Sequence, residues 1–386
     1  MSYETIVVGA GFAARQLIKS LRKQHAHCPI RLITADSGDD YSKPELSHVV
    51  SQQRRADDLT RMHAAHFAEE QRITLLSHTA VTAINASRRQ VICGDRQYDY
   101  HTLVLATGAS AVLPPIPGRE WMLTLNSQQE YRQAETRLMQ ATRILVVGAG
   151  LIGSELAMDM AQAGKHVMMA DRASHLLSAL LPAELSARLQ TTLLQQGVEL
   201  LLGTELQQVE KTEAGLRVTL MSGHTLVVDE VISAIGLRAN TGLAAAAGLS
   251  VNRGIVTDSQ LRTSDPHIYA LGDCAEINGK LLPFLQPIQL TASIAANSIA
   301  ARLTPETHHP QGEQPLTLPA MLIKVKTPLF PLQLAGETQN PALTWHLIAD
   351  HGGIVAKGMA GEQLRAFVVG GDRMKEAFPL LRQLSS

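Results

Sequence analysis

Two glycine-rich turns, each preceded by a short apolar run, constrain this chain more than any other feature. The first run, Ile-Val-Val over residues 6–8, leads into Gly9-x-Gly11-x-x-Ala14. Such a run is typical of a buried parallel strand, and the amphipathic stretch after the turn is typical of a helix. A strand, a glycine turn and a helix N-terminus in this order predict a pyrophosphate site, because glycines let the backbone approach the anion and the free N–H groups of the first helical turn attract it.

The second turn, Gly148-x-Gly150-x-x-Gly153, follows an equally apolar run. One such motif is weak evidence, but two copies in one chain argue against coincidence. Each copy is followed by a second apolar strand that ends near an acid, Asp36 in the first copy and Asp171 in the second. A carboxylate about 20 residues beyond the glycines is placed to hold ribose hydroxyls. We therefore expect an α/β fold with two Rossmann-like dinucleotide-binding domains.

Further small or acidic residues follow other apolar strands. One strand ends in Thr107-Gly108, and a later one ends in Gly272-Asp273. Small residues at a strand end permit close approach to a phosphate, and a carboxylate at the ligand edge of the sheet can accept hydrogen bonds from a polyol. Gly236 follows the second glycine unit and resembles Gly108 in its placement. This symmetry predicts that one nucleotide domain is inserted in the other.

Prolines and glycines mark the expected domain connections, one directly after Gly108 and one over residues 304–319. The predicted division is a first dinucleotide domain over 1–110 and 237–310, an inserted domain over 111–236, and a small C-terminal α+β domain over 311–386. We also expect residues 53–71 to form a helix.

Composition excludes several classes of function. The net charge of −1 gives no overall field that would attract nucleic acid or a membrane surface. The chain shows neither a basic start before an apolar run nor about 18 consecutive apolar residues, so we expect a cytoplasmic protein. Its three cysteines are widely spaced and its histidines form no ligand motif, so we expect no metal site and no dithiol centre.

Taken together, these motifs resemble the pyridine-nucleotide-dependent FAD reductases, which have two dinucleotide folds. Three stretches are most similar to rubredoxin reductases: Tyr-Ser-Lys-Pro-Glu-Leu-Ser at 41–47, Gly-Asp-Cys-Ala-Glu-Ile at 272–277 and Val-Lys-Thr-Pro at 325–328. The resemblance covers nearly the whole chain. It implies an enzyme that takes a hydride from NADH onto FAD and passes single electrons to the rubredoxin centre of a flavorubredoxin. That transient partner would act as a nitric oxide reductase, so the chain would support nitric oxide detoxification.

The resemblance also implies roles for individual residues. FAD would be bound by Gly9, Gly11, Phe12, Ala13, Ala14, Asp36, Lys43, Val81, Thr107, Gly108, Gly272 and Asp273. NADH would be bound by Gly148, Gly150, Leu151, Ile152, Gly153, Glu155, Asp171 and Gly236. Lys43, with Glu155 as its partner, and Lys326 would tune the flavin by favouring negative charge on its reduced form. No protein nucleophile is expected. Lys324, Lys326 and Lys43 are candidates for docking an acidic rubredoxin.

Other acceptors stay open at this point. Ferredoxin and monodehydroascorbate reductases share the architecture and lack a catalytic cysteine. A disulfide or peroxide reductase would need a redox-active cysteine beside the flavin, and the loop over residues 36–47 has none. A flavoprotein that senses NADH and acts by binding is the alternative from a different class.

Overall fold

A computed structural model of the chain describes residues 4–303, 320–325, 327 and 329–384. The chain divides into two compact units, and neither is continuous in sequence. The first unit comprises Met1–Ser42, Thr60–Ser110 and Leu237–Leu318, and the second comprises Lys43–Leu59, Ala111–Gly236 and Pro319–Ser386. Each unit therefore contains one of the two glycine turns.

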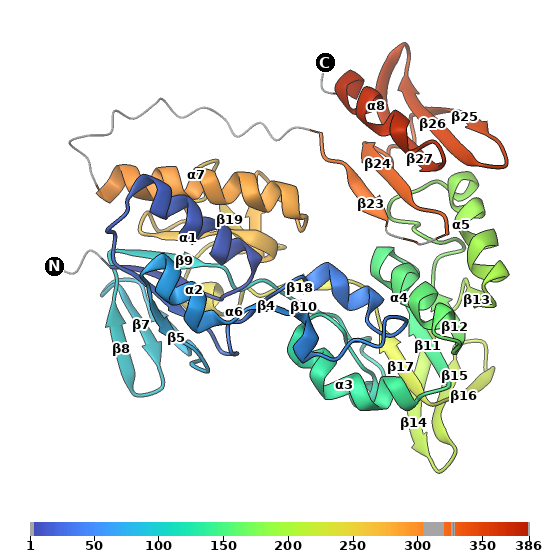
Figure 1. The fold of residues 1–386 in the computed structure, drawn as a ribbon, viewed down its shortest axis with the longest axis horizontal. Helices are drawn as coiled ribbons and strands as arrows, with labels where there is room; N and C mark the ends of the chain where they lie inside the picture. The colour runs from blue at the N-terminus through green and yellow to red at the C-terminus, as the bar shows by residue number, and fades with distance from the viewer. Residues whose placement is uncertain (1–3, 304–319, 326, 328, 385–386) are drawn as a thin grey trace. The chain divides into compact units, whose positions relative to one another are not determined.

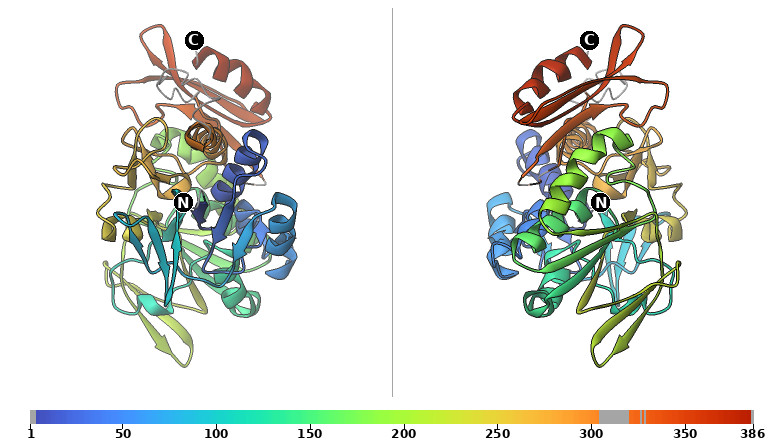
Figure 2. Two further views of the ribbon diagram at one scale, coloured as in Figure 1. Left: turned by 90° about the vertical axis from the view of Figure 1, so that its left-hand side faces the viewer. Right: turned by 90° about the vertical axis from the view of Figure 1, so that its right-hand side faces the viewer.

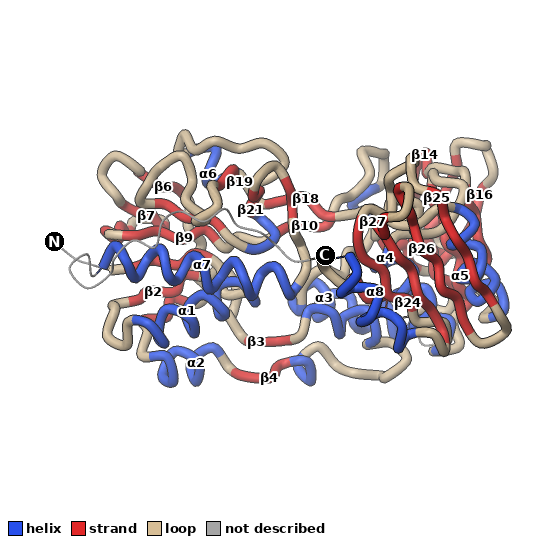
Figure 3. The backbone as a smooth tube through the Cα atoms, turned by 90° about the horizontal axis from the view of Figure 1, so that it is seen from above, coloured by secondary structure: helices blue, strands red, loops and turns tan. Residues whose placement is uncertain are grey.

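The first unit is built on a five-stranded parallel sheet with the order β20-β9-β1-β2-β5. Its strands are β1 (Thr5–Val8), β2 (Ile30–Ile33), β5 (Thr74–Leu76), β9 (Thr102–Leu105) and β20 (Ile268–Ala270). Helices α1 (Phe12–Gln24) and α7 (Leu285–Leu303) lie side by side and bury their apolar faces in the same core as the sheet (Figures 1 and 3). The central strand β1 is buried along its whole length, as a near-continuous apolar run predicts.

Smaller elements complete the first unit. One small sheet consists of β6 (Ala83–Asn85), β7 (Gln90–Cys93) and β8 (Arg96–Asp99), and another consists of β19 (Ile255–Thr257), β21 (Ala275–Ile277) and β22 (Lys280–Leu281). Strands β3 (Asp40–Tyr41) and β4 (Thr60–Met62) form a pair. The remaining helices are α2 (Ala64–Gln71) and α6 (Gly242–Ala246). Strands β10 (Ala109–Ala111) and β18 (Leu237–Ala239) pair where the chain leaves this unit and where it returns. The helix expected over residues 53–71 is wrong for most of its length, because only α2 is an α-helix there and the short strand β4 precedes it.

The second unit repeats the plan of the first. Its parallel sheet has the order β13-β12-β11-β17, formed by β11 (Arg143–Val147), β12 (His166–Asp171), β13 (Glu199–Leu202) and β17 (Glu230–Ser233). In both units the strand before the glycine turn lies between the next parallel strand and one much later in the chain. Helices α3 (Gln128–Gln140), α4 (Leu151–Gln162) and α5 (Ala183–Gln195), with the antiparallel strands β14 (Leu206–Thr212), β15 (Gly215–Leu220) and β16 (Thr225–Val228), complete this part.

The C-terminal part of the chain forms an antiparallel sheet with the order β23-β24-β27-β26-β25. Its strands are β23 (Ile323–Val325), β24 (Leu332–Gly336), β25 (Thr344–Ala349), β26 (Gly353–Ala360) and β27 (Gln363–Gly371). The amphipathic helix α8 (Ala377–Leu384) covers one face of this sheet, with Leu380 packed in a core that includes Phe367 and Val369 (Figure 2). Among the described helices, none is long and apolar enough to cross a lipid bilayer.

The substitution Gly9→Ala tests the first glycine turn. Gly9 has a φ of +100°, and a Cβ at this position would lie 2.2 Å from the carbonyl oxygen of Ala106. Gly94 also has a positive φ, but a Cβ there would have no neighbour within 4 Å, so Gly94→Ala is the matched control. We expect Gly9→Ala to lower the free energy of unfolding by about 2 kcal/mol more than the control does. The reason is that the backbone at Gly9 or at Ala106 must move to make room for the new Cβ. Urea denaturation of the two variants measures this, and equal losses would contradict the close approach.

Candidate dinucleotide-binding sites

The carboxyl ends of three neighbouring strands bring the predicted residues of the first unit to one edge of the sheet. Val8 of β1 pairs with Leu105 of β9, which pairs with Ala270 of β20. The residues that follow these three positions are the ones predicted from sequence: Gly9 to Ala14, Thr107 with Gly108, and Gly272 with Asp273. The carboxyl edge of an open parallel sheet is where ligands bind in such folds.

Gly272 allows the third strand end to approach the first helix. It is buried and has a φ of +80°, and a Cβ there would lie 2.7 Å from Cβ of Ala13 in the first turn of α1. A side chain at this position would therefore push the two elements apart. The neighbouring half-buried Asp273 consequently follows a backbone that lies against the N-terminus of α1.

The N-terminus of α1 has the character of an anion site. Its N-cap residue is Gly11, no side chain caps it, and its first turn contains no acid. By contrast, Ser127 at the N-cap of α3 accepts a hydrogen bond from the backbone N–H of Glu130. A Cβ on Gly11 would meet no protein atom within 4 Å, so this glycine is not required by packing within the chain. A bare helix N-terminus beside open space fits the pyrophosphate of a dinucleotide.

Asn240, which the sequence analysis missed, holds the second strand end in place. Its side-chain Nδ2 donates to the carbonyl oxygen of Thr107, and the Thr107 hydroxyl donates to the carbonyl oxygen of Asn240, both at 2.8 Å. The backbone N–H of Asn240 also donates to Gly108 at 3.0 Å. The only local signal for this role is a polar residue that directly follows a short strand, which is too common to be informative.

Asp36 is held by its own loop. Its Oδ1 accepts hydrogen bonds from the Thr34 hydroxyl at 2.6 Å and from the backbone N–H of Gly38 at 2.9 Å. The side chain is exposed, so its other oxygen can reach a ligand. Val81 is half-buried in the loop between β5 and β6. The roles expected for these two residues in binding FAD stay predictions.

A hydrogen bond that occurs in both units shows whether Asp36 and Asp171 occupy equivalent positions. The first glycine of each turn donates its N–H to the neighbouring strand, from Gly9 to Ile33 and from Gly148 to Ala170, both at 2.8 Å. The next residue is Thr34 in the first unit and Asp171 in the second, so Asp36 lies two residues beyond the position of Asp171. The two acids therefore do not occupy equivalent positions.

Packing requires glycine at two positions of the second turn. Gly148 has a φ of +110°, and a Cβ there would lie 2.4 Å from the carbonyl oxygen of Ala234, just beyond β17. A Cβ on Gly153 would lie 1.9 Å from the carbonyl oxygen of Gly148, so only glycine lets α4 pack on the turn. The remaining glycine, Gly150, is the N-cap of α4, has open space around its Cβ position and lacks a side-chain cap. These are the three roles that glycine has in a dinucleotide turn.

Asp171 ends β12 with both carboxylate oxygens fixed. Oδ2 accepts from the backbone N–H of Ala149 in the glycine turn at 2.6 Å, and Oδ1 accepts from that of Ala173 at 2.7 Å. The carboxylate is thus oriented before any ligand arrives. The other residues of the predicted NADH site follow the same strand ends: Leu151 and Ile152 begin α4, and Gly236 lies three residues beyond β17 with a φ of +124°.

The predicted flavin-tuning residues lie partly within the second unit. Lys43 is half-buried and begins the 3₁₀ helix η1 (Lys43–His48), which packs against α4. Glu155 of α4 is 9% exposed and accepts a hydrogen bond from the Ser47 hydroxyl at 2.7 Å. Ser47 belongs to one of the stretches that carry the family resemblance, but its own role was missed. Lys326 lies outside the described residues, whereas Lys324 is described and exposed in β23.

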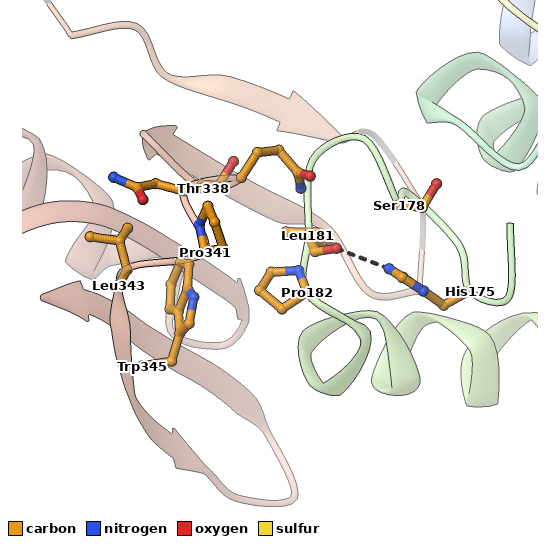
Figure 4. Close-up of a pocket in the computed structure, with 10 residues that line it drawn as sticks. His175, Ser178, Leu181, Pro182, Thr338, Pro341, Leu343 and Trp345 are labelled. Carbon is orange, nitrogen blue, oxygen red and sulfur yellow. Dashed lines mark hydrogen bonds between the residues drawn. The ribbon is translucent and has the colours of Figure 1, made fainter.

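A cavity of about 320 Å³ also lies in the second unit (Figure 4). It is lined by His175, Ser178, Leu181, Pro182, Thr338, Gln339, Asn340, Pro341, Leu343 and Trp345. One wall is fixed by a hydrogen bond at 3.2 Å between the His175 ring and the carbonyl oxygen of Leu181. The lining includes none of the residues predicted to bind a dinucleotide.

Comparisons with known proteins identify two families in this chain. The model described as "Pyridine nucleotide-disulphide oxidoreductase" matches residues 3–300, and the one described as "Rubredoxin binding C-terminal domain" matches residues 315–384. A relative from Pectobacterium atrosepticum is 62% identical over 388 residues, and one from Salmonella paratyphi B is 58% identical over 386 residues. Both alignments cover 100% of each chain, and both relatives are named "Nitric oxide reductase FlRd-NAD(+) reductase".

Solved structures agree with this assignment. The chain is similar to putidaredoxin reductase in its covalent complex with putidaredoxin, with a TM-score of 0.87, 26% identity and coverage of 99% of this chain and 93% of that one. It is also similar to a ferredoxin reductase from Rhodopseudomonas palustris, with a TM-score of 0.86, 25% identity and coverage of 100% and 96%. The expected α/β fold class and the family resemblance are confirmed. The chain belongs to the pyridine nucleotide-disulphide oxidoreductase family, which uses FAD and NAD(H), and ends in a rubredoxin-binding C-terminal domain.

Proposed function

We propose that this chain reduces the rubredoxin centre of a flavorubredoxin with electrons from NADH, and so supports nitric oxide detoxification by that partner. The observation that carries the proposal is the succession, in one chain, of two dinucleotide-binding sheets and a rubredoxin-binding domain. Full-length relatives at 58% and 62% identity, named as reductases of this kind, support it.

The donor and the acceptor of this reaction differ in how they handle electrons. NADH delivers two electrons as a hydride, whereas a rubredoxin iron accepts one at a time. Bound FAD supplies the conversion, because a flavin accepts a hydride and releases single electrons. The residues of the chain have to bind the two nucleotides, orient them and tune the flavin. This reaction needs no protein nucleophile.

For FAD we propose binding of the pyrophosphate by the N-terminus of α1, with the ribityl chain held by Asp273. For NADH we propose the equivalent site at the N-terminus of α4, with Asp171 on the adenosine ribose. The bare N-caps Gly11 and Gly150 support both assignments. In the proposal Lys43, partnered by Glu155, and Lys326 favour negative charge on the reduced flavin.

We also propose the division into an FAD domain, an inserted NADH domain and a C-terminal interface domain. The unit breaks after Ser110 and after Gly236 support the insertion. A cytoplasmic location is part of the proposal as well. All three cysteines are free and buried, which fits a reducing compartment.

A ferredoxin is the second candidate acceptor. The similarity to putidaredoxin reductase and to a ferredoxin reductase, each over 99% of this chain or more, favours it. Both candidates accept single electrons, so the two proposals share the nucleotide sites and differ only in the docked partner. The rubredoxin-binding family match over residues 315–384 decides between them in favour of rubredoxin.

Gly11→Ala should weaken FAD binding without affecting the folded apoprotein. Gly11 and Gly242 both lie at the start of a helix in the first unit, and a Cβ at either would meet nothing within 4 Å. Only Gly11 is proposed to face the pyrophosphate, so we expect an FAD affinity at least about tenfold lower for Gly11→Ala, or ~1.4 kcal/mol. Gly242→Ala is the control. Titration of apoprotein with FAD, followed by flavin fluorescence, measures the difference, and equal affinities would count against the site.

Asp171 should set the choice of coenzyme. A carboxylate accepts hydrogen bonds from both ribose hydroxyls and repels a 2′-phosphate, so we expect at least about a tenfold preference for NADH over NADPH in kcat/KM. Asp171→Asn should reduce this ratio. Asp36→Asn, the same change in the first unit, should leave the ratio unchanged and weaken FAD binding. Equal use of both coenzymes by the unsubstituted protein would contradict the assignment.

Anaerobic mixing of catalytic amounts of the FAD-loaded chain with NADH and an isolated flavorubredoxin tests the acceptor. We expect rapid bleaching of the visible absorbance of the rubredoxin iron, at a rate that falls as salt rises, because transient docking of an acidic partner is screened by salt. A ferredoxin and monodehydroascorbate serve as parallel acceptors. Reduction of a ferredoxin alone would favour the second candidate, and slow turnover with every acceptor would favour a redox sensor.

A further inference from the structure

A short segment of the chain lies with the second unit, although its neighbours in sequence on both sides belong to the first. The chain leaves the first unit after Ser42 and returns at Thr60, next to the paired strands β3 and β4. The segment between them, Lys43–Leu59, belongs to the second unit, and Figure 1 shows it in blue beside the green helices α3 and α4. Lys43, the proposed flavin-tuning lysine, is its first residue.

Two carboxylates of α4 hold the beginning of this segment. Glu155 and Asp159 are four residues apart, so they lie on the same face of the helix. The hydroxyl of Ser47 donates to Glu155 at 2.7 Å, and the hydroxyl of Ser51 donates to Asp159. Asp159 also accepts from the backbone N–H groups of Val50 at 2.9 Å and of Ser51 at 3.3 Å. Two pairs of residues thus join the segment to α4.

Burying the carboxylate of Asp159 costs free energy of folding. The residue is 2% exposed, and burial raises the pKa of its carboxyl, while the bonds from Ser51 and Val50 lower it. A buried carboxylate contributes less net stability than a well-packed apolar residue of similar size, because it must be desolvated. What the carboxylate does provide is direction, since its oxygens fix two successive backbone N–H groups in one orientation.

The far end of the segment is held independently. Glu135 of α3 accepts a hydrogen bond from the backbone N–H of Ala56 at 2.9 Å, and the Tyr131 hydroxyl donates to the carbonyl oxygen of Arg54 at 2.6 Å. These contacts lie on α3 and not on the helix that begins at the glycine turn. The segment therefore has two anchors of the same chemistry, and the α4 anchor is the nearer of the two to Lys43 along the chain.

We propose that Asp159 is a positioning residue that fixes Lys43 to the helix whose N-terminus binds NADH. Asp159 lies nine residues beyond Gly150, about 13 Å along α4, and is therefore remote from the helix N-terminus proposed to bind NADH. In this inference Asp159 acts on the flavin only through the segment. This inference rests on the proposed roles of Lys43 and of the second glycine turn. It adds that α4, the proposed NADH-binding helix, fixes the position of Lys43. It does so through two contacts, Asp159 with Ser51 and Glu155 with Ser47.

The flavin midpoint potential of the FAD-loaded full chain tests the inference, measured anaerobically against reference dyes. Lys43→Gln should make the potential more negative, because it removes a positive charge that stabilises the reduced flavin. Asp159→Asn keeps the size of the side chain but turns an amide group toward two backbone donors, so it should shift the potential in the same direction. The double variant should shift it no further than Lys43→Gln alone, since both changes act through one lysine.

Glu135→Gln is the matched control, because it loosens the anchor on α3 and should leave the potential unchanged. An unshifted potential in Lys43→Gln would remove the proposed role of Lys43 and this inference with it. A shift in Lys43→Gln but not in folded Asp159→Asn would overturn the inference alone, as would additive shifts in the double variant. If Asp159→Asn does not fold, Ser51→Ala takes its place under the same criteria.

Discussion

The close approach of a glycine to the neighbouring strand is the constraint on which both nucleotide sites depend. Gly9 and Gly148 each turn the chain at a positive φ, with no room for a Cβ against the residue that follows β9 or β17. This turn directs the next helix so that its N-terminus lies at the carboxyl edge of the sheet. The bare N-caps at that edge are then available to an anion, which is why the same local geometry occurs in both units.

Helix α4 has two tasks in the second unit. Its N-terminus faces the glycine turn, while Glu155 and Asp159 hold the segment that begins with Lys43. Burying a carboxylate costs free energy of folding because it must be desolvated. A helix that buries two of them therefore has a defined geometry at the expense of maximal stability. In the first unit α1 buries a mainly apolar face in the common core, and its buried Arg15 donates to the carbonyl oxygen of Gly38 in the loop before β3.

The cysteines explain why a member of a disulphide oxidoreductase family is suited to a different acceptor. Cys28, Cys93 and Cys274 are all free and buried, and burial raises the pKa of each thiol. A thiol with a raised pKa is a poor nucleophile and a poor redox centre. The C-terminal domain matches a family that binds rubredoxin, which is an electron acceptor outside the chain.

The sequence by itself determined the glycine turns, the strands and helices beside them, and which residues follow the ends of the strands. It could do so because the spacing of glycines and apolar residues is a local property. The family followed from these motifs. The tertiary structure decided that Asn240 holds Thr107, that Ser47 meets Glu155, that Thr34 corresponds to Asp171, and that residues 53–71 are mostly not helix. Ser47 and Glu155 are 108 positions apart, and such a pair is fixed only when two elements with separate local preferences pack together.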